Sequence, residues 1–347
     1  MVGVRNRGET IRQFIVNNVE AHTNDIVALT ANEFDISRQA VNVHIKRLVK
    51  QKSIIAEGNT RNRSYHLHPL MEDAKRFELS GLEEDRVWRD YVVPKLGTLP
   101  DNVVDVCNYG FTEMLNNAID HSQGRYAIVS VKKTPVFLEI IITDDGLGIF
   151  ARIQKFLDLN DERHAVLELS KGKLTTDPAN HTGEGIFFSS RMFDEYAILS
   201  GGVYFSHEYN KPEDWIMERN NPRSGTTVFM KISNNSAREI KAVFNDFASG
   251  EDYGFDKTVV PVSLARYGNE RLVSRSQAKR LLARIDRFKI VILDFEGIDQ
   301  IGQAFADEVF RVFNNRHPEI QLHFIKTQPY VENMIVRALS SRVGSEI

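Results

Sequence analysis

Residues 112–122 read TEMLNNAIDHS and combine side chains that can bind ions and polar ligands with helical apolar spacing. Residues four apart lie on one helix face, so Glu113 and Asn117 should point the same way. Asp120 and His121 follow at the end of the stretch. Oxygen ligands of this kind suit a hard cation such as Mg²⁺. A solvated helix face would explain the same residues, so the rest of the sequence has to decide between the two.

Three glycine-containing segments follow along the chain. In VFLEIIITDDGLGI an apolar strand leads into Asp144, Gly146 and Gly148. Glycines directly after a buried strand let the backbone turn tightly and approach a ligand. An aspartate at the strand end can accept a hydrogen bond from an exocyclic amine. This segment therefore predicts a binding loop at the end of a strand.

The two later segments add a loop suited to phosphate and the entry to a second strand. In HTGEGIFFSSRMFDEYAI, Gly183 and Gly185 precede a helical run, and backbone N–H groups at a helix N-terminus suit phosphate. In RSGTTVFMKI, Gly225 and Thr226 lead into an apolar strand. Each segment alone is a weak signal, because glycine turns are common. Their order after the polar helix is a much stronger one.

In this order the four segments resemble the GHKL ATP-binding superfamily, which includes gyrase, histidine kinases, mismatch-repair ATPases and anti-sigma kinases. The resemblance covers residues 100–232. It implies that ATP and Mg²⁺ are the cofactors, that Asn117 binds Mg²⁺, and that Glu113 is catalytic, acting on the attacking water in members that hydrolyse ATP. Asp144 would bind the adenine amine. The cofactor-binding residues that it implies are Asn117, Asp120, Asp144, Gly146, Gly148, Gly183, Gly185 and Thr226.

Two better-known branches of the superfamily carry features that this sequence does not match. Residues 80–100 hold no His and are too short for the dimerising helical hairpin of a sensor histidine kinase. The sequence also has no clear equivalent of the second domain that supplies a lysine to the γ-phosphate in gyrase-type and mismatch-repair ATPases. Slow intrinsic hydrolysis is therefore expected.

Residues 150–182 occupy the place of the superfamily's ATP lid and form a polar stretch without strong periodicity. A lid closes over the phosphates and excludes water. Lys171 and Lys173 could neutralise phosphate charge there, although a solvated surface run is an equally good interpretation.

Residues 1–69 carry the pattern of a winged helix-turn-helix. Two helical patterns precede ISRQAVNVHIKRLVKQKSI, where Ser37 is a good N-cap, and two short strands follow around a turn at Gly58. Residues 1–68 hold ten Lys and Arg against six Asp and Glu, in a chain whose formal net charge is -3. This local excess fits DNA binding; a winged helix used only for protein contacts is the alternative. The expected DNA-binding residues are Arg38, Gln39, Asn42, Lys46, Arg61 and Arg63.

Residues 255–347 read as a small α/β unit with the order helix, strand, helix, strand, helix. SRSQAKRLL and IGQAFADEVFRVF resemble the STAS-like family that follows GHKL domains in some regulators, which implies a protein partner. In STAS anti-sigma antagonists a phosphorylatable Ser opens the helix after the central strand. Gly302 and Gln303 stand at that place here, so phosphorylation is not expected there. Ser274 or Ser276 is expected to cap a helix.

The composition is that of a soluble globular protein. The chain has 347 residues, with 42% hydrophobic and 26% charged residues. Cys107 is the single cysteine, which excludes a disulfide framework and a thiolate metal site within the chain. No apolar run approaches the ~20 residues of a membrane span, and the N-terminus has no apolar signal region. A cytoplasmic location without membrane contact is expected.

Together these patterns predict an α+β multidomain protein. Its parts would be a winged helix over 1–69, a GHKL α/β sandwich over 80–235 with a mixed sheet and helices on one face, and a STAS-like domain over 255–347. The leading functional hypothesis is an ATP-dependent regulator of transcription that binds DNA. The alternatives are an anti-sigma-type protein Ser/Thr kinase and a DNA-clamping ATPase in genome defence. Dimerisation is common in the superfamily, which makes a homodimer one option.

Overall fold

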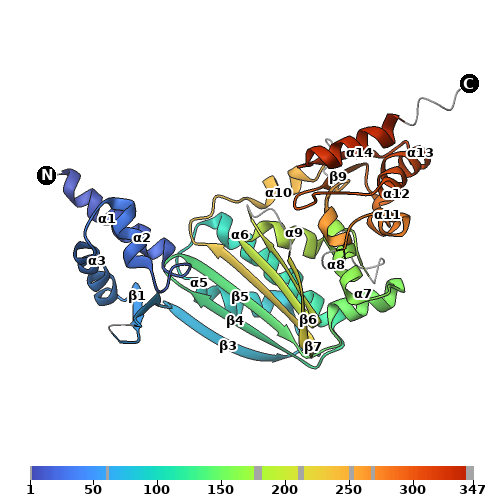
Figure 1. The fold of residues 1–347 in the computed structure, drawn as a ribbon. Coiled ribbons are helices and arrows are strands. Elements are labelled where there is room, and N and C mark those ends of the chain that lie inside the picture. Colours follow the sequence, from blue (N-terminus) through green and yellow to red (C-terminus); the bar gives the residue numbers. More distant parts are fainter. Residues whose placement is uncertain are drawn as a thin grey trace, which may run out of the picture.

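The computed structural model describes residues 2–59, 62–175, 182–209, 215–249, 254–266 and 270–340. Figure 1 shows an elongated molecule with the N-terminal helices at one end, a large sheet in the middle and a small α/β unit at the other end. The predicted class of a multidomain protein with both helices and strands is confirmed, and it contains both antiparallel and parallel sheets.

The N-terminal unit consists of three helices and a hairpin around its own core. Ser37 caps the third helix as predicted, with its Oγ accepting a hydrogen bond from Ala40 N at 3.2 Å. Apolar side chains from all three helices and the hairpin pack together, including Ile15, Ile26, Val41 and Ile54. The elements are α1 (Val2–Asn18), α2 (Ile26–Phe34), α3 (Arg38–Lys50), β1 (Ile54–Glu57) and β2 (Ser64–Leu67).

The central sheet has five strands in the order β3-β4-β5-β7-β6, and every neighbouring pair is antiparallel. The predicted mixed sheet is therefore wrong. The strand β7 lies between β5 and β6 and pairs with both in the antiparallel sense, so β5 and β6 run in the same direction without pairing with each other. The strands are β3 (Met71–Glu78), β4 (Tyr126–Lys133), β5 (Phe137–Asp144), β6 (Glu195–Glu208) and β7 (Trp215–Ser233).

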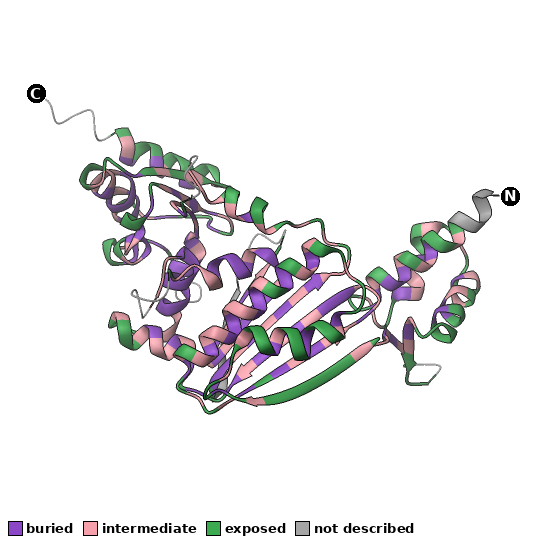
Figure 2. Ribbon diagram, turned by 180° about the vertical axis from the view of Figure 1, so that it is seen from behind, coloured by how far each residue is buried: buried purple, intermediate pink, exposed green. Residues whose placement is uncertain are grey.

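The helices of the central unit cover one face of this sheet, as predicted (Figures 1 and 2). Alternate residues of β4, Ala127, Val129 and Val131, are buried under them, which is the period-2 pattern of a sheet covered on one side. The covering elements are α4 (Glu84–Val87), η1 (Trp88–Val92), α5 (Val93–Leu96), α6 (Asp101–Asn116), η2 (Asn117–His121) and α9 (Gly185–Met192).

The C-terminal unit is a three-stranded parallel sheet, β10-β9-β8, with short helices around it. The predicted strands near 290 and 321 are present, and β8 precedes them as a strand that the sequence pattern did not indicate. Ser274 caps α11, accepting from Gln277 N at 3.2 Å. The elements are β8 (Lys257–Pro261), η3 (Val262–Ala265), α11 (Arg275–Leu282), η4 (Ile285–Arg287), β9 (Ile290–Asp294), α12 (Gln303–Ala306), η5 (Asp307–Phe313), α13 (Asn314–Arg316), β10 (Gln321–Ile325) and α14 (Pro329–Ser340).

The central and C-terminal units share one continuous hydrophobic core, whereas the N-terminal unit has a separate one. Two helices inside the predicted lid make part of this junction, α7 (Ile149–Leu157) and α8 (Glu162–Lys171). Every residue of α8 from His164 to Lys171 is buried. Up to Lys171 the predicted lid therefore contains two helices and is not a polar, solvated loop. Residues 176–181 of the predicted lid lie outside the described residues.

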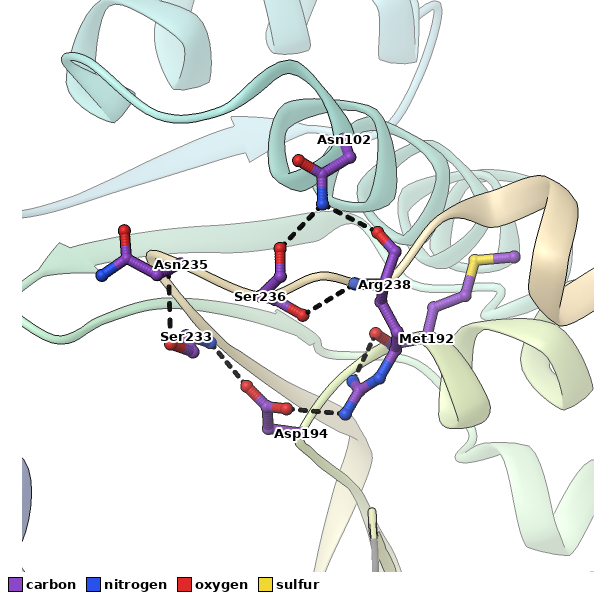
Figure 3. A network of polar contacts seen from close by, with 7 residues as sticks. All are labelled: Asn102, Met192, Asp194, Ser233, Asn235, Ser236 and Arg238. Atoms are coloured by element: carbon purple, nitrogen blue, oxygen red, sulfur yellow. Dashed lines mark hydrogen bonds and ion pairs between the residues drawn. The ribbon is translucent and has the colours of Figure 1, made fainter.

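A polar network fixes the chain where it leaves the sheet after β7 (Figure 3). Arg238 donates to the carbonyl of Met192 at 2.7 Å and to Asp194 Oδ1 at 2.7 Å. Asp194 Oδ2 accepts from Ser233 N at 2.5 Å, and Asn102 Nδ2 on α6 donates to the Arg238 carbonyl at 2.9 Å. The network joins α6, the end of α9, the start of β6 and the end of β7 before the chain continues through α10 (Ile240–Asp246) to the C-terminal unit.

Candidate functional site

A cavity of about 300 Å³ in the central unit lies between α6 with η2, the end of β5, α7 and the start of α9. Most of the residues predicted from the four sequence segments meet there, although they come from parts of the chain far apart in sequence. Those that line the cavity are Glu113, Asn117, Asp144, Gly148, Gly183, Gly185 and Thr226.

Asp120 and Gly146 are the two predicted cofactor-binding residues that do not line the cavity. Asp120 is exposed on the π-helical turn η2. Gly146 has a supporting role, since its N–H donates to Asp144 Oδ1 at 2.9 Å. A Cβ on Gly146 would overlap the carbonyl of Ser122 and stand 2.8 Å from Ser122 Cβ, so only glycine fits this approach.

Asp144 lines the cavity and is only 7% exposed. Its Oδ1 accepts from Gly146 N and, at 3.3 Å, from Thr226 N. Among the described residues, no hydrogen bond to Oδ2 is found, so this oxygen remains for a donor in the cavity. Burial raises the pKa of the Asp144 carboxyl, and the two backbone donors partly oppose that effect.

Thr226 joins the loop after β5 to the strand β7. Its Oγ1 accepts from Ile149 N, the first residue of α7, at 3.0 Å. Gly148, directly before that helix, has φ of +91°, and a Cβ there would stand 2.6 Å from Ser200 Oγ. The positive φ and the close packing both favour glycine. The segment DDGLGI therefore forms a tight turn that holds Asp144 and Thr226 in fixed positions beside each other.

The opposite end of the cavity brings the loop with Gly183 and Gly185 against the polar helix. A Cβ on Gly185 would overlap Glu113 Oε2, so the start of α9 touches this carboxylate. Gly183 has φ of +74° and packs on the backbone of Leu174. Backbone N–H groups at the start of α9 are suited to an anion. Asn117 and Glu113 lie one helical turn apart on the wall beside them.

Arg152 and His121 also line the cavity. Arg152 is not part of the sequence motifs that indicated the other polar lining residues. Arg152 donates from Nη1 to the His121 carbonyl, which ties α7 to the end of η2. Its position four residues after Gly148 would have placed it on the cavity side of α7, given a helix beginning at Ile149. Among the described residues that line the cavity, Arg152 is the one with a permanent positive charge.

Neither interpretation of Lys171 as a lid residue agrees with the structure. Lys171 is 1% exposed, and its Nζ donates to Glu168 Oε1 at 2.6 Å and to the Ala283 carbonyl at 2.8 Å. Burial lowers its pKa, which the Glu168 carboxylate opposes. Lys173 donates to the Arg287 carbonyl at 3.0 Å. Both lysines face the C-terminal unit and do not line the cavity.

The described residues among those predicted to bind DNA lie on α3 and directly before β2. Arg38, Gln39 and Lys46 are exposed, Asn42 is half-buried, and Val41, Ile45 and Leu48 face the core. Arg63 on the hairpin is exposed as well, whereas Arg61 lies outside the described residues. The described side chains thus present a polar and basic helix face to solvent.

Two structural features are absent from the described parts of the chain. No group of three or more His, Cys, Asp or Glu there could hold a metal ion by itself. None of the helices there is both long enough and apolar enough to cross a membrane.

Comparison with known proteins bears on the C-terminal unit. Residues 277–332 match the family profile of a STAS-like domain of unknown function (DUF4325). A search among curated proteins gives no match to the chain. The matched region runs from α11 to the start of α14 and contains β9 and β10. The predicted STAS-like character of the C-terminal unit is therefore confirmed for residues 277–332.

Proposed function

We propose that the central unit binds ATP with Mg²⁺ and that the chain is a nucleotide-dependent regulator whose N-terminal unit is a DNA-binding winged helix. The observation that carries the proposal is the meeting of four separate sequence segments around one cavity, at Glu113, Asn117, Asp144, Gly185 and the residues beside them. Concave sites with a few convergent polar groups in an apolar wall are typical of ligand pockets.

The two ends of the cavity differ in the way that ATP requires. Asp144 Oδ2 and the neighbouring Thr226 form a buried polar pair suited to the adenine amine. Apolar wall residues, among them Ile142, Ile153 and Ile186, would contact the base and ribose. The loop with Gly183 and Gly185 offers backbone N–H groups at the start of α9, where phosphate oxygens would be accepted. We place the phosphates at that end.

Magnesium fits this arrangement only as an ion shared with the nucleotide. Among the described residues there is no acidic cluster that could hold a cation alone. Asn117 supplies a neutral oxygen beside the carboxylate of Glu113. Mg²⁺ commonly keeps several waters and binds through one or two protein oxygens and substrate phosphates, where it neutralises phosphate charge. Asn117 is thus the proposed protein ligand.

Glu113 is the proposed general base if ATP is hydrolysed. Its carboxylate lies against Gly185, at the end of the cavity where we place the γ-phosphate. A carboxylate in that position can orient a water molecule and accept its proton. Arg152 offers a positive charge on the cavity wall for the phosphates or the ribose.

The N-terminal unit supports the DNA-binding part of the proposal through the exposed basic and amide side chains of α3. Arg and amide side chains can bind base edges in the major groove, and Lys suits phosphate. Lys46→Ala in the full chain should weaken binding to duplex DNA. It should also reduce the slope of the logarithm of the binding constant against the logarithm of the salt concentration by about 1, as expected for the loss of one phosphate contact. The matched control is Lys241→Ala on α10, also exposed. Equal gel shifts for both variants across a salt series would contradict the assignment.

The fate of the ATP is tested by incubating the full chain with γ-labelled ATP, Mg²⁺ and cell extract, with and without duplex DNA. A nucleotide-dependent regulator with slow intrinsic hydrolysis predicts that nearly all of the label stays on ATP, with a low rate of phosphate release that DNA does not change. Free phosphate that increases with DNA would instead favour a DNA-clamping ATPase, and label on another protein would favour a protein kinase. Absence of nucleotide binding in a parallel filter assay would contradict the proposal itself.

A further inference from the structure

Residues Gly172–Thr175, called here the junction segment, lie between the C-terminal unit and the cavity. Leu174 and Thr175 line the cavity, whereas Gly172 and Lys173 contact the C-terminal unit. Gly172 and Lys173 both have left-handed backbone conformations, with φ of +84° and +51°. A non-glycine residue in this region is uncommon and persists only where its surroundings hold it.

An arginine pair, Arg284 and Arg287, holds that conformation from the C-terminal unit. Arg284 Nη2 donates to the Lys173 carbonyl at 3.1 Å, and Arg287 Nη1 donates to the same oxygen at 3.0 Å. In return, Lys173 Nζ donates to the Arg287 carbonyl at 3.0 Å. Charged donors make these hydrogen bonds stronger than neutral ones.

A buried ion cluster anchors the same segment one turn earlier. Lys171 pairs with Glu168 at 2.6 Å, and Arg284 Nε lies 3.4 Å from Glu168 Oε2. Thr258 Oγ1 on β8 donates to the Lys171 carbonyl at 2.7 Å. The exposure of Lys171 and Glu168 is 1% and 3%. Charges this deep need their partners in place, so the end of α8 depends on the C-terminal unit.

The junction segment connects these contacts with the C-terminal unit to the wall of the cavity. Leu174 N donates to the Gly183 carbonyl at 3.1 Å, and Gly183 packs so tightly on Leu174 that a Cβ there would overlap its backbone. Gly172 fits between two aromatic rings, because a Cβ on it would stand 2.6 Å from Phe255 Cζ and 2.9 Å from Phe187 Cδ2. Phe187 itself lines the cavity.

From these contacts we infer that the C-terminal STAS-like unit regulates the nucleotide affinity of the cavity through the hydrogen bonds of Arg284 and Arg287 to Lys173. The inference rests on the proposed ATP site. When the C-terminal unit is docked, Leu174 and the loop with Gly183 are held in one position, and ATP binds a wall that is already ordered. Coupling between sites is reciprocal, so bound ATP also strengthens the docking of the C-terminal unit. A partner that binds the C-terminal unit and separates it from the junction segment would therefore lower the affinity of the cavity for the nucleotide.

The test compares Arg287→Ala with Arg316→Ala in the full chain. Both side chains are exposed on the C-terminal unit, but only Arg287 reaches the junction segment among the described contacts. Calorimetric titration with ATP and Mg²⁺ should show binding weakened about fivefold or more in Arg287→Ala and unchanged in Arg316→Ala. Affinity in Arg287→Ala equal to or tighter than that of the wild type would overturn the inference while leaving the ATP site intact. A wild type that binds no ATP would overturn both.

Hydrogen exchange on the wild type gives a second measurement that does not depend on a folded variant. ATP with Mg²⁺ should slow exchange of the Leu174 amide and of amides in residues 284–288. Exchange at α13 should stay the same. Slowing confined to the cavity, with residues 284–288 unchanged, would show that the C-terminal unit is not coupled to the site.

Discussion

Gly185 lies directly against the carboxylate of Glu113, and a Cβ at residue 185 would overlap Glu113 Oε2 and stand 2.8 Å from Cδ. The contact joins the start of α9 to the middle of the cavity wall formed by α6. Because Gly185 does not have a positive φ, the backbone itself would accept another residue. Glycine is required there by the carboxylate, which links the two sequence segments physically.

Gly185→Ala should therefore move Glu113 without damaging the helix, since alanine is a better helix former than glycine. We expect hydrolysis of ATP to fall about 100-fold, because misplacement of a catalytic group by an ångström has effects of that size. Steady-state phosphate release measures it. Gly254→Ala is the matched control, since nothing lies within 4 Å of the Cβ that it adds. Equal rates in the two variants would exclude a role for the Glu113 position.

Glu113→Gln should separate binding from chemistry. The amide keeps the size of the side chain and its contact with Gly185, but it cannot accept a proton as a base. ATP binding should stay within about twofold of the wild type, while hydrolysis should fall by about 10²–10⁴-fold. Single-turnover assays with labelled ATP measure both quantities. Retained hydrolysis would assign the base to another group.

Asp144→Asn should stabilise the protein without ligand and weaken ATP binding. Burial raises the pKa of Asp144 above its value in the unfolded chain. The Asp144 carboxyl group therefore contributes its full stabilisation at pH values below its pKa in the unfolded chain. That stabilisation is lost as the pH rises through its pKa in the folded protein. The asparagine avoids this loss while its Oδ1 can still accept from Gly146 and Thr226.

Urea denaturation between pH 4 and pH 8 checks that expectation. The wild type should lose stability relative to Asp144→Asn as pH rises, and the two should converge at low pH. ATP affinity of the variant should fall by about 10–100-fold, the worth of a hydrogen bond to a charged group. A variant less stable than the wild type at pH 8 would show that the charge of Asp144 does not destabilise the unliganded protein.

Arg238→Ala should destabilise the fold by about 1–3 kcal/mol, because it removes the donor to the Met192 carbonyl and to Asp194 Oδ1. The Arg238 side chain is 11% exposed, so water replaces it poorly. Arg89→Ala is the control, since Arg89 pairs at the surface with Asp85 at 3.6 Å. That variant should change the free energy of unfolding by less than about 1 kcal/mol. Equal effects in chemical denaturation would contradict a structural role for the network in Figure 3.

Much of the site could be predicted because its residues sit in local patterns. The apolar spacing of Phe111, Met114 and Leu115 predicted the helix that carries Glu113, and all three are buried. The apolar run before Asp144 predicted β5. The strand order was harder, because nothing in the local sequence of β7 indicates that it inserts between β5 and β6. Pairing over long sequence distances is decided by the whole sheet.

Two features of the fold differ from the sequence-based expectation, for separate physical reasons. Glu168 and Lys171 looked like residues of a solvated loop, since charged residues are rarely buried. They are buried because the Ala283 carbonyl and the Arg284 side chain complete their contacts. These two partners lie 112 residues or more further along the chain. The strand β3 was missed because its sequence, MEDAKRFE, belongs to a mostly exposed edge strand without clear alternation.

Calorimetric titration of the full chain with ATP and Mg²⁺, carried out on the wild type, Asn117→Ala and Asp144→Ala, tests whether the cavity is a nucleotide site. We expect one ATP per chain for the wild type, weaker binding when Mg²⁺ is chelated, a loss of that Mg²⁺ dependence in Asn117→Ala, and little or no binding in Asp144→Ala. ATP binding that is unchanged in Asp144→Ala would contradict the assignment of this cavity to the nucleotide.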